Sequence, residues 1–566
     1  MASLTKKKVR GHTYWYAREC AWVDGRPKIV WQKYLGKADA IVEAMAGKPK
    51  VPEPKKTVLA KFGAVAACFG MSQRLRLCEI VDRHAPKRDQ GLSVGTYMEL
   101  AAINRAVAPT SKHAFAEWFE TTALRRLIPA EKRMLTSQRF WDHMGFLDEE
   151  RIRAIETDLT AHLVKEFKLD LRRLVYDATN FYTYINTRTK SELAQRGKNK
   201  QKRNDLRQVS LALMVTEEFH IPLFHALYGG NINDPTSFGS VVDELIERHR
   251  AIADQCERVT LVFDKGNNSE ENIQRIDASE FHFVGSLVPS HHSDLLKVPR
   301  SKYVSLKGSR FEDVSAYRTT KTVFGQKRTT VVTFNENLFD AQVRGLGWQL
   351  QKKRRELRAL KVRLAKRASG KVTRGRKPTL VSVQQQVDRI LSWQYHSDLF
   401  DVDVRERRGH VTLSFKTNTT AVAQLHRRQF GKTILFTDNN RWGNERIVAA
   451  YRGQYRVEDA FKQMKHPAFV SWKPRFHWTD DKIRVHAFYC VLALTITSLL
   501  QRELFRKGLE ISIPNMMENL TSIIEVAISY PKNQVAGDPV CLTLGEMTRL
   551  QKTLYQLLGL KKYRAV

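Results

Sequence analysis

The spacing of apolar and polar residues changes several times along the chain, and each spacing predicts a different kind of structure. Residues 13–35 alternate with a period of two on both sides of the turn residues DGR, which predicts a β-hairpin. Residues 58–160 instead place apolar residues near helical spacing, with Ser93 and Ser137 as candidate N-caps. The chain therefore begins with a hairpin region and continues into a mainly helical domain.

From about residue 171 the pattern changes to short apolar runs, of the kind that form strands of a sheet. Turns or helical stretches separate these runs, so strands in hairpins are followed by strands that alternate with helices, and a mixed α/β sheet is expected. The predicted strands are LVYDATNFYTY at 174–184, SLALMVT at 210–216, PLFHALY at 222–228, TLVFD at 260–264 and FHFVGSLV at 281–288, with a helix from about 236 to 252.

Residues 289–435 break this rhythm with strand-like pieces at 302–308, 314–334 and 400–416. Between them, residues 349–378 carry 13 Lys or Arg against one Glu, which gives 13 − 1 = +12. Their first half is an amphipathic basic helix with Leu350, Leu357, Leu360 and Leu364 on one face. A solvated charge run is the alternative, but contact with phosphates is the favoured interpretation.

The final third of the chain returns to helical spacing. Residues 443–507 predict two helices, of which the second contains the apolar run 487–500. That run is too short to span a bilayer and is expected to be a buried helix. The predicted domains are 1–46, 57–165, a core made of 171–288 and 436–507, an insertion at 289–435, and a helical C-terminal region at 508–566.

The charge of the chain narrows the class of partner. Lys and Arg total 95 and Asp and Glu total 59, so the formal net charge is +36, which favours a polyanion such as DNA. The six cysteines form no close pair, which argues against a zinc ribbon or a disulfide framework. No Walker A motif, GxSxG motif or signal peptide is visible in the sequence.

Three carboxylates occupy positions that suit two-metal phosphodiester chemistry. Such chemistry needs a few carboxylates on rigid elements, since hard divalent ions take oxygen ligands. Asp177 and Asp264 each end an apolar strand, and Glu458 lies on a predicted helix. A strand-end Asp is more often a turn residue and a helical Glu is usually solvated. The hypothesis therefore rests on the order of all three in a strongly basic chain.

Several motifs around these residues resemble the bacterial insertion-sequence transposases of the DDE class, in the group with a Tyr-Arg-Glu-Lys signature helix. The resemblance covers most of the chain and is looser at 300–430. It is carried by YDATN around Asp177, RNDLRQV ending at Val209, YGGNINDPTSF at 228–238, FDKGNNSEENI at 263–273, YRGQYRVEDAFKQMK at 451–465, HWTDDKIRVHAFYCVLAL at 477–494, and the N-terminal pieces WQKYLG and GLSVGTYMELAAINRAVAPTSK.

The signature helix of that family places Tyr, Arg, Glu and Lys at fixed intervals. Tyr451, Glu458 and Lys465 fit these intervals, whereas Gln454 stands at the Arg position. The flanking Arg452 and Arg456 are candidates to replace that Arg, because guanidinium groups suit phosphate. The departure puts the handling of the DNA end in doubt, including whether hairpins form. The expected DNA-binding residues are Tyr451, Arg452, Arg456, Lys465 and, in the basic helix, Lys352, Arg354 and Arg355.

The resemblance implies an α/β fold with an RNase H-like catalytic core, a β-rich insertion and a helical N-terminal domain. It implies cut-and-paste transposition, in which Asp177, Asp264 and Glu458 hold two Mg²⁺ ions, with Mn²⁺ able to substitute. The implied partners are duplex DNA with terminal inverted repeats, target DNA and a second copy of the chain, at the nucleoid in the bacterial cytoplasm. An inactive DNA-binding repressor and an RNase H-like nuclease are the alternatives.

Overall fold

The structure of the protein is a computed structural model, and its described part divides into two compact units. One unit holds residues 1–61, 523–546 and 564–566, and the other holds 62–522 and 547–563. The described residues are 2–23, 25–46, 53–87, 91–186, 188–197, 199, 203–232, 238–239, 242–244, 246–248, 259–392, 395–407, 409–473, 477–531 and 539–565.

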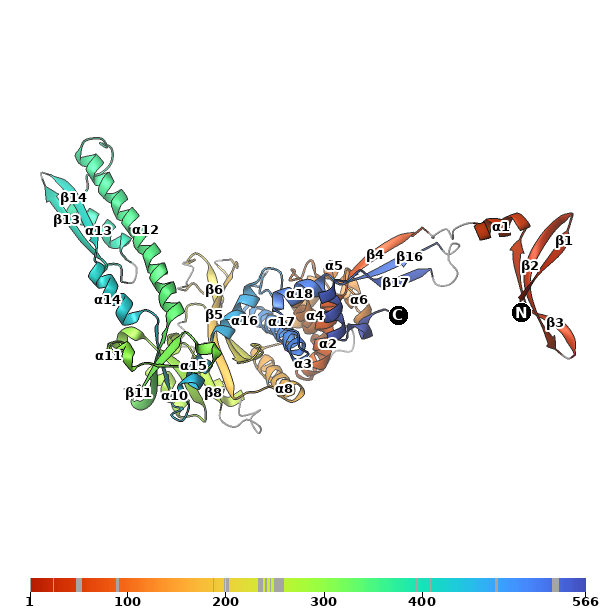
Figure 1. The fold of residues 1–566 in the computed structure, drawn as a ribbon, viewed down its shortest axis with the longest axis horizontal. Coiled ribbons are helices and arrows are strands. Elements are labelled where there is room, and N and C mark those ends of the chain that lie inside the picture. Colours follow the sequence, from red (N-terminus) through yellow and green to blue (C-terminus); the bar gives the residue numbers. More distant parts are fainter. Residues whose placement is uncertain are drawn as a thin grey trace. The chain divides into compact units, whose positions relative to one another are not determined.

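The first unit begins with a three-stranded antiparallel sheet, β1-β2-β3 (Figure 1). Strands β2 (His12–Val23) and β3 (Arg26–Gly36) confirm the predicted hairpin. A further strand, β1 (Ala2–Val9), was not predicted; it pairs with β2 from Ala2↔Glu19 to Val9↔His12. Helix α1 (Ala38–Ala46) follows the sheet.

A second sheet in this unit joins the two ends of the chain. Strand β4 (Lys56–Lys61) pairs antiparallel with β16 (Ile524–Ser529), which also pairs with β17 (Val540–Leu544). The sequence pattern predicted helix both from residue 58 and throughout 508–566. Strands form there because IEVAIS supplies β-branched residues in alternation, and its pairing partner KTVLAK lies far away along the chain.

The second unit opens with the predicted helical part. Ser93 caps its long helix by accepting a hydrogen bond from the backbone of Thr96, whereas Thr136 and not Ser137 caps the helix that starts at 137. The helices are α2 (Gly63–Arg74), α3 (Leu77–His84), α4 (Val94–Val107), α5 (Phe115–Glu120), α6 (Leu124–Leu127), α7 (Ser137–Met144) and α8 (Glu149–Phe167).

A mixed sheet with the order β10-β11-β12-β15-β9-β8-β5-β6-β7 forms the centre of this unit. Strands β5, β6 and β7 pair antiparallel in that order. Strand β8 pairs parallel with β5, and β9 pairs parallel with β8. These five strands confirm the predicted runs, and they are β5 (Arg173–Thr183), β6 (Arg207–Thr216), β7 (Pro222–Gly229), β8 (Thr260–Phe263) and β9 (His282–Leu287). Part of the helix predicted at 236–252 lies outside the described residues.

Four strands of the predicted insertion extend this sheet beyond β9. Because β15 (Lys432–Thr437) pairs antiparallel with β9 and with β12 (Gln326–Asn335), the start and the end of the segment 289–435 meet inside the sheet. The outer strands are β10 (Val304–Ser305) and β11 (Val314–Val323). The short helices α10 (Glu270–Asp277) and α11 (Ser293–Leu296) flank β9 in the chain.

The middle of the insertion is a subdomain of helices and a two-stranded sheet (Figure 1). It has its own apolar core. Helix α12 (Glu336–Ala368) contains the predicted basic helix, and Leu357, Leu360 and Leu364 are buried as its pattern predicts. Asn335 caps this helix through its side chain. The remaining elements, which pack with α12 and with one another, are α13 (Leu380–Ile390), β13 (Phe400–Arg407), β14 (His410–Thr417) and α14 (Thr419–Gln429).

The last helices complete the second unit. They are α15 (Asn444–Arg452), α16 (Tyr455–Lys465), α17 (Asp480–Arg506), α18 (Ile513–Thr521) and α19 (Arg549–Leu557). Among the described residues, α17 alone is long and apolar enough to cross a membrane, but 94% of its most apolar window is buried in the protein. It packs against α4 and α2, as expected for a core helix.

Candidate active site

Asp177 and Asp264 stand side by side in the register of the central sheet. Strands β5 and β8 are parallel and pair Val175 with Val262, and each aspartate follows its valine by two residues. Because side chains alternate across a strand, both carboxylates belong to the same sheet face as the valines. Tyr176 points to the other face, where it is buried in the apolar core. The prediction that Asp177 ends its strand is wrong, because β5 continues to Thr183, where it still pairs with β6. The register nevertheless places Asp177 and Asp264 side by side on one face of the sheet.

Asp177 and Asp264 are called the carboxylate row below, and Ser286 lies next to this row on the adjacent strand. Strand β9 pairs Val284 with Val262, which puts Ser286 level with Asp264. The Ser286 hydroxyl donates a hydrogen bond to Oδ1 of Asp264 at 3.1 Å. No local sequence pattern marks this serine, because its place beside Asp264 depends on the pairing of β8 with β9.

Tyr451, near the end of α15, connects the signature helices to the carboxylate row through hydrogen bonds. Its phenol donates to Oδ1 of Asp264 at 3.1 Å and lies 2.8 Å from the hydroxyl of Ser286. Burial, and then the negative charge of Asp264, raise the pKa of the Tyr451 phenol above its usual value, and the charge of Glu458 adds to this shift. The phenol therefore stays protonated at neutral pH and acts as a donor to Asp264.

Glu458 lies in the first turn of α16, and its side chain is exposed. Helix α16 packs against β5, the strand that carries Asp177. The three predicted carboxylates thus lie on β5, directly after β8, and on a helix that packs against β5.

The donor atoms in this region fit a hard divalent ion. The carboxylate row supplies carboxylate oxygens, and the hydroxyls of Ser286 and Tyr451 lie next to it. Mg²⁺ prefers oxygen ligands and keeps several waters of its own. Within the described residues, no group of three or more His, Cys, Asp or Glu side chains is close enough to form a complete ligand set. The geometry therefore gives Asp177 and Asp264 side by side on adjacent strands, with the helix of Glu458 packed against β5.

Lys465, at the end of α16, reaches the same strand as Asp177. Its Nζ donates to the hydroxyl of Thr179 at 2.7 Å and lies 5.2 Å from the centre of the Phe181 ring. Thr179 follows Asp177 by two residues, so both side chains belong to one face of β5. The exposed ammonium of Lys465 is thus positioned next to the carboxylate row.

The unusual Gln454 lies where the signature helix is interrupted. It is the N-cap residue between α15 and α16 and makes no side-chain capping bond. Arg452 donates to the carbonyl of Arg310 at 2.7 Å and lies over the ring of Phe311, so it connects α15 to the insertion. The side chain of Arg456 lies outside the described residues. Replacement of the signature Arg by either residue stays a prediction.

A cleft of about 410 Å³ opens beside Asp264 and Tyr451. One wall comes from the insertion, where Tyr395 donates a hydrogen bond to the side chain of Gln429 at 2.6 Å. This wall leaves no pattern in the sequence, because the pairing of β12 with β15 brings its residues together. The other insertion residues that line the cleft are Leu338, Gln342, Phe430, Lys432 and Thr433.

The predicted DNA-binding cations of the insertion lie on the outer face of α12. Lys352, Arg354 and Arg355 are exposed, while Leu357 and Leu360 of the same helix are buried. The helix therefore offers its positive charge to the solvent and its leucines to the subdomain core.

Three comparisons with known proteins were made, and one of them identifies a family. The family model described as "Transposase DDE domain" matches residues 168–496, which is more than half of the chain. A piggyBac transposase, solved as a synaptic complex with hairpin DNA, is similar at 10% identity over 82% of each chain, with a TM-score of 0.35. A comparison with curated protein sequences finds no match.

The family match covers the central sheet, the insertion, the signature helices and most of α17. It confirms the expected α/β catalytic core with a large mixed sheet. The chain belongs to the DDE transposase domain family, and it is an enzyme of metal-dependent phosphoryl transfer on DNA.

Proposed function

We propose that the protein is the transposase of an insertion sequence, which cuts DNA at the terminal inverted repeats of its element and joins the ends to a target. The observation that carries this proposal is the row of Asp177 and Asp264 on adjacent parallel strands, with the helix of Glu458 packed beside it. A cut-and-paste reaction needs hydrolysis and strand transfer at one such site. Two copies of the chain would pair the two ends.

Asp177 and Asp264 would hold the metal ions, and Glu458 would complete the set. Two Mg²⁺ ions, when bound, supply an activated water or 3′-hydroxyl and stabilise the leaving oxygen, and Mn²⁺ is expected to substitute. The hydroxyls of Tyr451 and Ser286 keep the Asp264 carboxylate in one orientation, which leaves its second oxygen for a ligand. Orientation of this kind is how a surrounding shell of side chains supports metal ligands.

The positive side chains near the row would bind the DNA backbone. Lys465 is exposed beside the face of β5 that carries Asp177, and the cleft at Asp264 separates the row from the insertion. The cations on α12 would hold DNA farther from the cut. Such contacts position the duplex and strengthen its binding without reading the base sequence.

A cleavage assay tests the proposal. The full chain is incubated with Mg²⁺ and a duplex that carries the inverted repeat flanking its gene, and the products are resolved on a denaturing gel. Asp177→Asn should lower the rate at least about 1,000-fold, equivalent to roughly 4 kcal/mol of transition-state stabilisation. The matched control Asp205→Asn removes an exposed aspartate paired with Arg203, and it should keep the native rate.

Three results would contradict the proposal, each in its own way. Equal cleavage by Asp177→Asn would remove the assigned site. Equal cleavage of unrelated DNA or of an RNA–DNA hybrid would support an RNase H-like nuclease. Binding of the end DNA without any cleavage by the native chain would support a repressor.

A further inference from the structure

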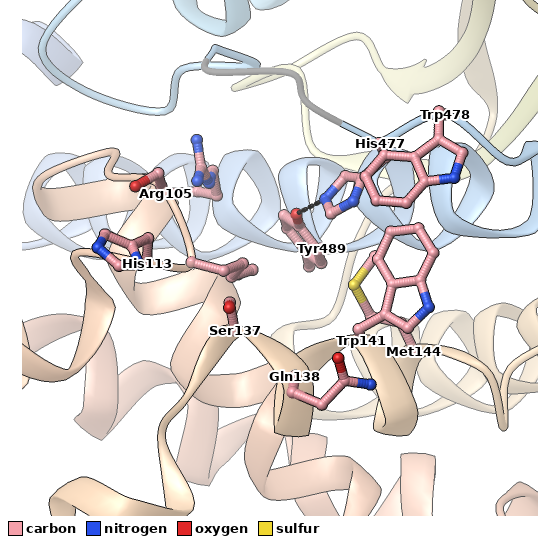
Figure 2. A pocket seen from close by; sticks show the side chains of 11 residues that line it. Arg105, His113, Ser137, Gln138, Trp141, Met144, His477, Trp478 and Tyr489 are labelled. Carbon is pink, nitrogen blue, oxygen red and sulfur yellow. Dashed lines mark hydrogen bonds between the residues drawn. The ribbon is translucent and has the colours of Figure 1, made fainter. Parts of the chain in front are cut away.

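A pocket of about 330 Å³ lies beside α7 and the start of α17, and it shares no lining residue with the cleft at Asp264 (Figure 2). One side is aromatic, because Trp141 of α7 stacks on Trp478 with ring centres 4.6 Å apart. Figure 2 shows Arg105 on the opposite side. The lining residue Gln138 is exposed, so the pocket is open to the solvent. Its volume suits a small organic molecule.

The charge that lines this pocket is of one sign. Its basic residues are Arg105, Lys112, His113 and His477. No Asp or Glu is among the described residues that line it. The buried Arg328, elsewhere in the second unit, pairs with Asp277, whereas Arg105 donates to the carbonyls of Lys473, at 2.7 Å, and Thr110. The wall of the pocket therefore carries positive charge without a carboxylate of its own.

Two buried donors of the pocket residues lack an acceptor. They are Nε of Arg105 and Nζ of Lys112, neither of which has a hydrogen-bond partner among the described residues. The Lys112 ammonium lies 4.4 Å from the ring centres of both Phe140 and Tyr489. Burial, and then the charge of Arg105, hold the pKa of Lys112 well below its usual value. A buried donor without an acceptor is costly, and an anion that accepts from both nitrogens would remove this cost.

We propose that this pocket binds a small aromatic carboxylate from solution. The ring of such a ligand would pack on the wall of Trp141 and Trp478, and its two oxygens would accept hydrogen bonds from Lys112 and Arg105. An inorganic anion would leave the tryptophan faces uncovered. An uncharged aromatic compound would leave the two donors without a charged acceptor. The inference does not rest on the proposed function, since no part of the carboxylate row takes part in it.

The pocket belongs to the packed core of the second unit. Tyr489 lines it, and His486 hydrogen-bonds both the Tyr489 hydroxyl, at 2.6 Å, and the Trp472 carbonyl, at 2.7 Å. Trp472 in turn stacks on Phe181 of β5 with ring centres 4.4 Å apart. A ligand that binds only the folded pocket stabilises the unit that forms it. Binding should therefore raise the unfolding temperature of the second unit.

Isothermal titration calorimetry of the full chain, in EDTA and without DNA, tests this inference. Cinnamate is the probe, and cinnamamide is a control of similar shape without the charge. The native chain should prefer cinnamate over cinnamamide by about ten- to hundred-fold, as expected when hydrogen bonds to a charged group are lost. Acetate has no ring and should not compete with cinnamate at equal concentration.

Four variants separate the two halves of the site from each other and from folding. Lys112→Met removes one donor and should lower the preference for cinnamate by at least about fivefold. Trp478→Ala changes a half-exposed residue and should weaken both probes alike, and Trp478→Phe should restore most of the affinity. The control Lys507→Met removes an exposed lysine at the other end of α17 and should change neither affinity.

Equal affinity of the native chain for the two probes would overturn the inference, and so would an unchanged preference in Lys112→Met. Displacement of bound cinnamate by duplex DNA would also overturn it, because the pocket would then belong to the DNA interface. Cleavage of end DNA in Mg²⁺ is measured separately. Loss of cleavage in Asp177→Asn with cinnamate binding intact would support two separate sites, and a native chain that binds cinnamate but never cleaves would contradict the transposase activity alone.

Discussion

The phenol of Tyr451 donates a hydrogen bond to the carboxylate of Asp264, so a residue of the signature helices contacts a predicted metal ligand on the central sheet directly. The two residues are 187 positions apart in the chain. The contact explains why a tyrosine belongs to the signature, since the same oxygen also meets Ser286. Tyr451 is therefore expected to position a metal ligand.

Tyr451→Phe tests this positioning role. Loss of a hydrogen bond to a charged group corresponds to about 1.5–3 kcal/mol, so cleavage should fall by roughly ten- to hundred-fold. The concentration of Mg²⁺ that gives half of the maximal rate should rise, which a purely structural change would not cause. The control Tyr555→Phe alters a tyrosine on α19 and should change neither quantity.

Lys465 should contribute to DNA binding through its charge. Lys465→Ala removes the ammonium beside the carboxylate row, so the affinity for all duplexes should fall, and the slope of log K against log salt should decrease by about one. The control is Lys462→Ala on the same helix, whose ammonium forms an exposed ion pair with Asp459. Equal slopes for the two variants would contradict a specific role for Lys465.

The exposed cations on α12 should act together in the same way. Changing Lys352, Arg354 and Arg355 to Gln removes three charges from the outer face of the helix and leaves its leucines in place. If all three contact phosphates, the salt slope should decrease by about three. A variant with Lys552, Lys561 and Lys562 changed to Gln loses equal charge elsewhere and should keep the native slope.

The sequence predicted the strands of the central sheet well because they are short apolar runs, although β5 continues past Asp177 to Thr183. Asp177 and Asp264 could be proposed as metal ligands from their places after apolar runs, and Glu458 from the spacing of the signature helix, and their role stays a prediction. Ser286 and the cleft wall around Tyr395 could not be identified, since long-range strand pairing creates them. Strand pairing over hundreds of residues leaves no local pattern to recognise.

The same limit explains the errors at the two ends of the chain. Residues 56–61 and 524–529 form strands because they pair with each other across more than 460 positions. Each run alone is too short and too mixed to be distinguished from a helix. The basic helix was predicted correctly, since Leu357, Leu360 and Leu364 recur at helical spacing within a single segment.

Leu357 should be important for the stability of the insertion subdomain. Its side chain is fully buried in the core between α12, α13 and β14, so Leu357→Ala should lower the stability of this subdomain by about 2–5 kcal/mol. Limited proteolysis within 336–430 should accelerate accordingly. Val362→Ala, at a half-exposed position of the same helix, should have an effect below about 0.5 kcal/mol. Equal protease sensitivity of the two variants would show that the leucine core does not hold the subdomain.

His477 should make the stability of the second unit depend on pH. Burial, and then the charges of Lys112 and Arg105, lower the pKa of His477 from 6.5 to about 3. Between these values the unfolded chain binds a proton that the folded chain does not, so the free energy of unfolding falls as the pH falls. From pH 7 to pH 5 the loss from this one group is about 2 kcal/mol.

Urea unfolding at pH 7 and pH 5 measures this loss, with tryptophan fluorescence as the signal, since the ring of Trp141 lies 5.9 Å from that of His477. His477→Gln cannot take up the proton, so its midpoint should change less between the two pH values than that of the native chain. His410→Gln alters an exposed histidine on β14 and should retain the native pH dependence. If His477→Gln loses as much stability as the native chain on acidification, another group must carry the effect, and His477 is then not buried in its neutral form.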